Sequence, residues 1–180
     1  GPHTLNTDKT HQSTRRHFPT LMTGIFESTW LAPYAPRSID THYKLLDTDN
    51  SAIFEVDWVQ GSAMLVQREV YEQIGGLDEG YVMYSEEMDW CKRAKDVGWK
   101  VVYHGEAFII HHGGKSSDQI GAFKQIHFHT SKLRYFRKHH GYGTYLILRI
   151  ITLLLFTWQM LIEGLKGLIG HKRDMRLNRV

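Results

Sequence analysis

A regular alternation of apolar and polar positions begins only after the first third of the chain. Residues 1 to about 50 are polar and irregular, and they predict no regular element. The apolar run at 63–66 predicts a short buried strand. Val70 and Ile74 then share one face of a predicted short helix, which Gly75 ends as a C-terminal cap.

Ser85 is the predicted N-cap of a second helix, which ends at Gly98. Two strands are predicted after it, at 99–103 and 107–110. Because strands and short helices alternate, the pattern indicates an α/β layer. The apolar face of the second helix consists of Trp90, Ala94 and Val97.

The last third of the chain predicts two longer helices. Residues 122–140 have the pattern of a basic amphipathic helix, which the glycines of Gly141-Tyr142-Gly143 break. The apolar run at 145–162, roughly 18 residues, is near the lower limit for spanning a bilayer. Basic residues flank it on both sides, at 137–138 and 172–173, so charge asymmetry fixes no orientation. The sequence leaves open whether this helix spans a membrane or lies on it.

Composition and charge refine this picture. With 180 residues and 42% hydrophobic content, we expect one domain over 1–121, followed by the basic helix at 122–141 and a membrane-associated tail at 142–180. One cysteine, Cys91, excludes an intramolecular disulfide. The net charge is +3, with acids gathered between Glu55 and Glu87 and bases after Lys124. We therefore expect the C-terminal third to meet lipid head groups or phosphates. Nucleic acid is not expected as a partner, because the basic stretch is short and continues into an apolar segment.

Five blocks of residues follow one another in a distinctive order. They are Asp57-Trp58-x-x-Gly61-Ser62, Gly75-Gly76-Leu77-Asp78-Glu79, the run from Tyr84 to Cys91, Gly98-Trp99, and His111-His112-Gly113-Gly114-x-Ser116. In this order and spacing they resemble the family 2 glycosyltransferases, in particular the bacterial rhamnosyltransferase-like members that act on cell-surface polysaccharide or lipid-linked glycans. The resemblance covers most of residues 55–140.

The resemblance implies a GT-A fold, of which this chain is the acceptor-side half. In that fold the N-terminal half binds the nucleotide and supplies an Asp-x-Asp metal motif. Asp47-Thr48-Asp49 matches the Asp-x-Asp pattern, but it sits in a polar loop ahead of the acceptor-side blocks. We interpret these residues as a solvated turn. The chain is then a fragment, which we expect to be inactive without the missing half.

An inverting transfer needs a carboxylate that takes the proton from the acceptor hydroxyl. Glu86-Glu87 stands where the family carries a Glu-Asp pair whose second member is the base, which implies Glu87 as the base. Glu86 is expected to support the donor side, and Asp89 to orient the loop or meet the acceptor. The alternative is that these acids only complement the helix dipole, by about 0.3 to 1 kcal/mol each.

The last block carries the residues expected to act on the donor diphosphate. His111, or its neighbour His112, is expected to bind a divalent metal, Mn or Mg. The alternative is a loop histidine that bonds to backbone. Gly113-Gly114 and Ser116-Ser117 would close over the diphosphate with backbone donors.

Further residues are expected to bind substrate. Gly61 and Ser62 occupy the turn where the family's backbone approaches the acceptor sugar. Trp58 and Trp90 offer faces for a sugar ring, or else belong to the core. The basic helix provides Lys132, Arg134 and Lys138, which would pair with the pyrophosphate of the donor or of a polyprenyl-linked acceptor, or face anionic lipid.

The sequence thus predicts an inverting glycosyltransferase that moves a sugar from a nucleotide-sugar donor to a cell-surface glycan or lipid-linked acceptor. We expect it at the cytoplasmic face of the bacterial inner membrane. Two alternatives remain. One is a non-catalytic, glycosyltransferase-like membrane scaffold. The other is a histidine-based metal-binding module, suggested by twelve histidines but lacking any finger-like spacing.

Overall fold

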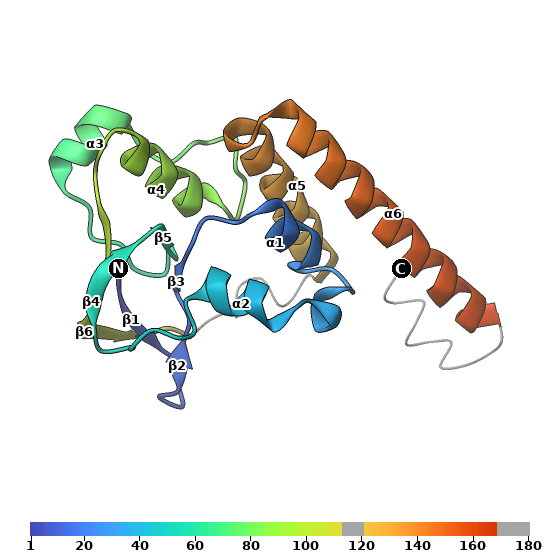
Figure 1. The fold of residues 1–180 in the computed structure, drawn as a ribbon, viewed down its shortest axis with the longest axis horizontal. Helices are drawn as coiled ribbons and strands as arrows, with labels where there is room; N and C mark the ends of the chain where they lie inside the picture. The colour runs from blue at the N-terminus through green and yellow to red at the C-terminus, as the bar shows by residue number, and fades with distance from the viewer. Residues whose placement is uncertain (113–120, 169–180) are drawn as a thin grey trace.

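A four-stranded sheet forms the base of the structure, a computed structural model that describes residues 1–112 and 121–168 (Figure 1). Its strand order is β2-β1-β6-β4. β1 and β6 run parallel, and the outer pairs β1–β2 and β4–β6 are antiparallel. The strands are β1 (Pro2–Leu5), β2 (His11–Gln12), β4 (Ile53–Val56) and β6 (Val101–Ile110).

Two very short strands form a separate ladder, and helices surround both sheets. β3 (Arg15–Arg16) pairs antiparallel with β5 (Trp58–Val59). The described residues hold six α-helices and the 3-10 helix η1, so the architecture is mixed α/β. These helices are α1 (Leu21–Phe26), η1 (Ala32–Tyr34), α2 (Arg37–Lys44), α3 (Arg68–Ile74), α4 (Glu86–Asp96), α5 (Gly121–His139) and α6 (Gly141–Leu168).

The core lies where α4 packs against β5 and β6. In β6, Val101 and Tyr103 point inward and Val102 between them points out, as the two-residue period of a strand requires. Cys91 and Ala94 of α4 are buried against them. Gly105 continues the inward row, because a Cβ there would lie 2.3 Å from the backbone carbon of Ser51. The absence of a side chain lets the chain before β4 lie directly on β6.

The last two helices form an antiparallel pair that α1 closes on one side. Gly141, with φ +84, makes the turn between α5 and α6. Phe136 of α5 and Leu148 of α6 are completely buried. A Cβ on Gly24 of α1 would lie 2.9 Å from the Phe136 ring, so this glycine permits the close approach. The pair supplies one wall of the candidate site.

The helices were predicted well, but of the strands only those that form β6 were predicted. The helices at 68–74, 86–96 and 121–139 and the long apolar helix are confirmed, although Val97 on the expected buried face is 49% exposed. The strand predicted at 63–66 is wrong. That segment is irregular and Leu65 is 99% exposed, because β4 and β5, just upstream, take the places beside β6 and β3.

The first 50 residues also differ from the prediction, since they contain β1, β2, β3, α1 and α2. Strands of two to four residues are too short to show a period, and their partners lie far along the chain. The strands expected at 99–103 and 107–110 form one strand, β6, which continues through Gly105 because its N–H bonds to the Ala52 carbonyl at 3.1 Å.

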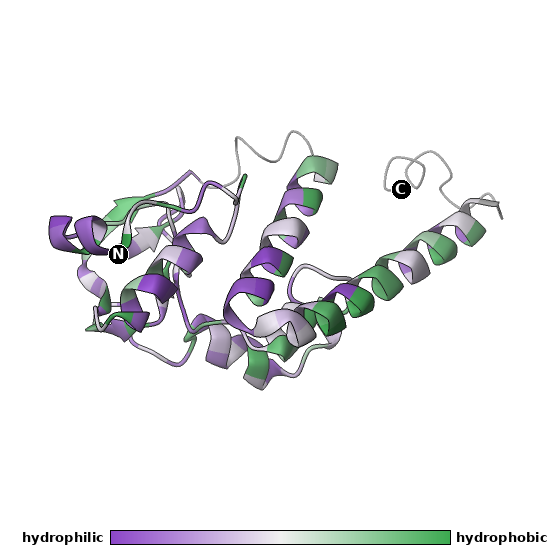
Figure 2. Cartoon of the chain, turned by 90° about the horizontal axis from the view of Figure 1, so that it is seen from above, coloured by the Kyte–Doolittle hydropathy of each residue, from purple (hydrophilic) through white to green (hydrophobic). Residues whose placement is uncertain are grey.

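α6 runs past α5 and leaves the body of the molecule, and most of its length is hydrophobic (Figure 2). The most apolar 18-residue window within residues 141–167 has a mean hydropathy of 1.9, so this helix is long and apolar enough to cross a membrane by length and composition. Only 11% of that window is buried inside the protein. The basic segment at 172–173 lies outside the described residues.

Candidate functional site

A cavity of about 580 Å³ opens between the start of α4, α5, the end of α1 and the end of β6. Residues from both ends of the chain line it, so the fold brings together segments that are distant in sequence. Its charged or ionisable side chains include Arg16, Glu27, Glu87, His111, His112 and Lys132. Carboxylates, imidazoles and cations therefore share one cavity, which is suited to moving a proton and holding an anionic group.

Glu87 is the carboxylate that the first turn of α4 presents to this cavity. The Gly61 N–H donates to its Oε1 at 3.2 Å, so two of the predicted site residues meet directly. Its Oε2 is buried and has no hydrogen-bond partner among the described residues. Burial, and then the charge of Glu86, raise the pKa of Glu87. One oxygen is thus held in place while the other is free to accept a proton.

The backbone ahead of α4 adopts a rare conformation that aims this turn. Tyr84 and Ser85 both have positive φ, 70° and 66°, where non-glycine residues cost about 1 to 3 kcal/mol each. Ser85 holds the N-cap position, but its side chain makes no cap hydrogen bond, which corrects the predicted capping role. Both residues line the cavity, and the Tyr84 hydroxyl is buried without a partner in the described part of the chain. Sequence reasoning missed Tyr84, because nothing in the residue types signals left-handed backbone there.

The three acids of the first turn point in different directions, as a step of about 100° per residue in a helix requires. Glu86 lines a separate groove beside Met64 and Trp90. Asp89 is completely buried away from the cavity. Of the three predicted catalytic acids, the structure thus brings only Glu87 to the cavity.

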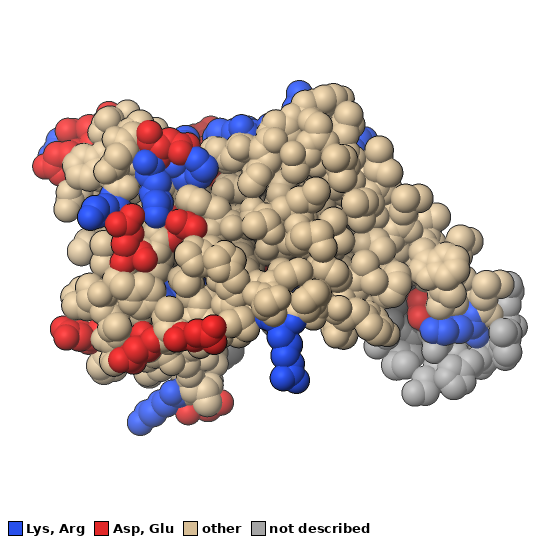
Figure 3. All heavy atoms as spheres, viewed as in Figure 1, with Lys and Arg blue, Asp and Glu red and all other residues tan. Residues whose placement is uncertain are grey.

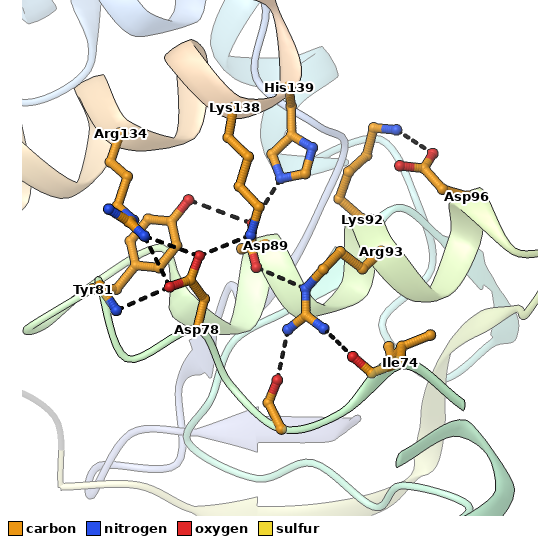
Figure 4. A network of polar contacts seen from close by, with 12 residues as sticks. Ile74, Asp78, Tyr81, Asp89, Lys92, Arg93, Asp96, Arg134, Lys138 and His139 are labelled. Atoms are coloured by element: carbon orange, nitrogen blue, oxygen red, sulfur yellow. Dashed lines mark hydrogen bonds and ion pairs between the residues drawn. The ribbon is translucent and has the colours of Figure 1, made fainter. Parts of the chain in front are cut away.

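Asp89 is the hub of a network that ties α4 to α5 (Figure 4). Arg93 Nε donates to it at 2.9 Å, and Lys138 Nζ and His139 Nε2 each lie 2.7 Å from its Oδ1. Burial alone would raise the pKa of Asp89, but the hydrogen bonds from His139, Lys138 and Arg93 outweigh it and hold the pKa well below the usual range. Asp89 therefore acts as a structural anion that fixes one wall of the cavity against another.

Two of the predicted phosphate-binding cations belong to the same network. Arg134 Nη2 lies 2.9 Å from Asp78 Oδ1, and Lys138 Nζ lies 2.8 Å from Asp78 Oδ2. In Figure 4 both side chains reach from α5 to the loop before α4. The sequence pattern predicted that they face phosphate or lipid; in the structure both are exposed and pair with Asp78 at the surface.

Lys132 lines the cavity from α5 but is buried against the end of α1. Its Nζ donates to the carbonyls of Gly24 at 2.8 Å and Glu27 at 3.0 Å, which the end of a helix leaves without partners. Burial lowers the pKa of Lys132 to about 8. Burial also raises the pKa of the Glu27 carboxyl, an effect that the nearby Lys132 opposes. Sequence reasoning missed Glu27, which has no motif around it.

His111 and His112 end β6 at the mouth of the same cavity. The His111 N–H bonds to the Leu5 carbonyl at 2.9 Å, and its Nδ1 lies 2.9 Å from Gln12 Oε1. Among the described residues, no three His, Cys, Asp or Glu side chains converge as a metal site. These residues alone therefore do not form a metal centre. Asp49 accepts from Ser51, as expected for a turn. The glycine and serine loop at 113–117 lies outside the described residues.

The two tryptophans have different positions. Trp58 lines the cavity, with its Nε1 bonded to the His17 carbonyl at 2.9 Å. Trp90 is buried outside the described lining of the cavity, where its Nε1 donates to the Gly75 carbonyl at 2.9 Å. Ser62 is half-buried and does not belong to the described lining of the cavity. Trp58 is therefore the tryptophan placed to meet a ligand.

The fold and the cavity define a general class of site, a mixed α/β domain with a buried carboxylate in a cavity. Comparison with known proteins narrows the class of protein. No protein-family model matches the chain, and no solved structure matches it with statistical significance. The chain is 30% identical over 141 residues to N-acetylglucosaminyl-diphospho-decaprenol L-rhamnosyltransferase of Mycobacterium tuberculosis, covering 78% of this chain and 46% of that protein.

Two further relatives match over shorter segments. Rhamnosyltransferase WbbL of Escherichia coli is 39% identical over 57 residues, which is 32% of this chain and 22% of that protein. Low-salt glycan biosynthesis hexosyltransferase Agl10 of Haloferax volcanii is 48% identical over 40 residues, 22% of this chain and 13% of that protein. The homologues of this chain are thus glycosyltransferases, and the chain spans about half the length of the relatives that it matches most extensively.

Proposed function

We propose that this chain forms the acceptor-side half of an inverting, nucleotide-sugar-dependent glycosyltransferase of family 2 with a GT-A fold. The observation that carries the proposal is the hydrogen bonding and burial of the Glu87 carboxylate. Its Oε1 is held by the Gly61 N–H, and its buried Oε2 has no partner among the described residues. The names of the relatives support sugar transfer as the reaction.

In the proposed reaction, Glu87 Oε2 takes the proton of an acceptor hydroxyl. The acceptor oxygen forms a bond to the anomeric carbon of the donor as the bond from that carbon to the nucleotide diphosphate breaks. The bonding electron pair leaves with the diphosphate, and attack from the opposite side inverts the anomeric configuration. The raised pKa of Glu87 suits this role, because a base works best when its pKa approaches the working pH.

The leaving diphosphate would lie toward His111, His112 and Arg16, which line the same cavity. A divalent metal, Mn or Mg, when bound would neutralise charge on that group. Because the described residues lack a three-ligand set, we propose that an Asp-x-Asp motif outside this chain holds the metal, with His111 or His112 as an additional ligand. The proton transfer to Glu87 does not depend on the metal.

The proposed substrates follow from the relatives' names and from the cavity. The donor would carry L-rhamnose or another hexose, and the acceptor a sugar on a polyprenyl diphosphate, at the cytoplasmic face of a bacterial membrane. Trp58 and the turn at Gly61 and Ser62 would meet the acceptor sugar. Trp90 and Arg134, which lie outside the described cavity lining, would position these elements.

The test is sugar transfer by the full-length protein that contains this chain, with dTDP- and UDP-sugars, a polyprenyl-diphosphate-linked acceptor, and Mn or Mg. We expect Glu87→Gln to lower kcat at least about a hundredfold, as loss of a positioned base typically does. The matched control is Glu69→Gln, an exposed glutamate on α3, which should keep the wild-type rate.

Two other results would count against the proposal. An active Glu87→Gln protein would reduce Glu87 to an acid that complements the helix dipole. If the wild-type protein transferred none of the sugars, the non-catalytic scaffold would be the better account.

A further inference from the structure

The outward face of α6 is apolar along almost its whole length. Arg149 is the single charged residue in 145–161. A helix that is hydrophobic on all sides is normally buried, yet this face is uncovered in the described protein. Its large apolar residues, each at least half exposed, are Ile147, Ile150, Leu153, Leu154, Trp158, Met160, Leu161 and Leu165.

Near its middle, α6 is held to the rest of the domain by contacts of its inward face. Trp30 Nε1 donates to the Leu155 carbonyl at 3.1 Å, and the Phe156 ring packs edge-on against His129 at 4.9 Å between centroids. His129 Nε2 in turn lies 3.2 Å from the Ser28 carbonyl. The helix midpoint is therefore bound to polar parts of α5 and of the segment after α1.

These contacts are incompatible with a helix that spans a membrane. Leu155 lies about 20 Å along α6 from Gly141, at roughly 1.5 Å per residue, which would be near the centre of a hydrocarbon core about 30 Å thick. His129 would lie at the same depth, with the cavity-lining pair Lys132 and Glu27 close behind it. The protein encloses these groups, but exposed polar residues of the same stretch of α5, such as Gln125 and Thr130, would then face hydrocarbon, at a cost of several kcal/mol each.

A second exposed apolar segment lies beside α6. Met22, Trp30 and Tyr34 are 47%, 37% and 74% exposed, and the rings of Trp30 and Tyr34 meet edge to face at 6.4 Å. Trp and Tyr are the residues favoured at a membrane surface. In Figure 3, charged side chains crowd the half of the molecule that holds α3, α4 and the sheet, while the surface over α6 is almost free of them until its far end.

We infer that α6 lies in the plane of a membrane surface, with its outward face and the Trp30–Tyr34 segment in the lipid, and does not span the bilayer. The inference rests on the membrane association in the proposed function, and it adds how α6 is oriented relative to the membrane. Arg149 and Lys166 suit anionic head groups, and Glu163, next to Lys166, is 19% exposed and paired with it. Because packed helices lie about 8 to 10 Å apart, the cavity wall formed by α5 then sits one helix layer above the lipid. A sugar on a lipid diphosphate would reach the cavity from that side.

The test measures the depth of three positions on one face of α6, seven residues apart. Spin labels are attached to Ile147→Cys, Leu154→Cys and Leu161→Cys variants of the full-length protein on phosphatidylglycerol–phosphatidylethanolamine vesicles. Depth is read from collisions with oxygen and with a water-soluble nickel chelate. The native Cys91 is buried and its pKa is raised to about 11, so it should label poorly, which the wild-type protein checks. Tyr71→Cys on α3 provides the exposed aqueous control.

We expect the three labels to share one shallow depth, roughly 5 to 10 Å below the head groups. Successive positions stepping by about 10 Å along the membrane normal would overturn the in-plane arrangement but leave membrane attachment standing. Labels that all stay in water, or that broaden one another between copies, would overturn lipid as the partner. Sugar transfer by the same variants, measured in detergent, tests the proposed reaction independently of these outcomes.

Discussion

At the scale of single residues, Glu87 and Asp89 show how two acids of one helix turn acquire opposite properties. Asp89 has hydrogen-bonding partners in Arg93, Lys138 and His139, and its charge is stabilised in the folded protein. Glu87 receives the Gly61 N–H but no cation, and Glu86 repels it. The charged form of Glu87 therefore weakens the fold, which is the usual cost of keeping a reactive group in a buried site.

This difference predicts a pH-dependent effect of Glu87→Gln on stability. The folded protein binds a proton on Glu87 more tightly than the unfolded chain, so the wild-type protein loses stability as the pH rises from 4.5 through the raised pKa. Glutamine removes this loss, by about 1.4 kcal/mol for each unit by which the pKa is raised. We expect the free energy of unfolding of the variant, relative to wild type, to increase between pH 4 and pH 7.5 in urea titrations. A constant difference, like that expected of Glu69→Gln, would show that Glu87 is not perturbed.

At the scale of elements, the entry to α4 depends on strained backbone. Tyr84 and Ser85 are consecutive non-glycine residues in the left-handed region, and they lead directly into the turn that carries Glu87. The Ser85 side chain makes no capping hydrogen bond, so it does not stabilise the start of α4. The fold around this turn, including the Asp89 network, holds the strained residues in place.

Ser85→Gly should therefore stabilise the protein by about 0.5 to 1 kcal/mol, because glycine adopts positive φ without a steric penalty. Ser85→Ala is the matched control and should change stability little, since no cap hydrogen bond is lost. Thermal or urea unfolding of both variants measures the effect. A loss of about 1 kcal/mol in the alanine variant would instead establish the side-chain cap that the sequence predicted.

The elements that could be predicted are those whose own sequence carries a period. α4, α5 and α6 are long enough to repeat their apolar face, and Gly75 and Gly141 mark helix boundaries. The short strands could not be found, because β1 and β3 depend on partners about 100 and 40 residues away in the chain. The apolar run at 63–66 was wrongly predicted to be a strand, because apolar character alone does not supply the neighbouring strand with which a β-strand must pair.

At the scale of the whole molecule, the site was predicted in part. Glu87, His111, His112 and Lys132 do meet around one cavity with Trp58. The ordered blocks of the resemblance pointed to Trp58, Glu87, His111 and His112, whereas Lys132 was predicted from the charge of the basic helix. Arg16 and Glu27, which also line the cavity, come from segments without a motif, and only tertiary packing brings them there. Tyr84 begins the third block, but nothing in its residue type marked it as a site residue. Conversely, Arg134 was predicted to face phosphate or lipid from its charge alone, and charge does not reveal that Asp78 is its partner.

The whole molecule also relates the cavity to α6. α5 contributes to the cavity on one side and packs against α6 on the other. An in-plane α6, as we infer it, would set the cavity close to a substrate that remains attached to lipid. This arrangement links the proposed reaction and the inferred membrane geometry through a single helix.

The most direct test of the central claim, that Glu87 is the base, is the pH dependence of kcat/KM for sugar transfer by the full-length protein. The base must be unprotonated, so we predict that wild-type activity falls on the acid side with a midpoint above 4.5, the ordinary value for glutamate. The residual activity of Glu87→Gln should lack this acid limb. If the variant kept the same limb as the wild-type protein, another group would be the base, and the role proposed for Glu87 would be contradicted.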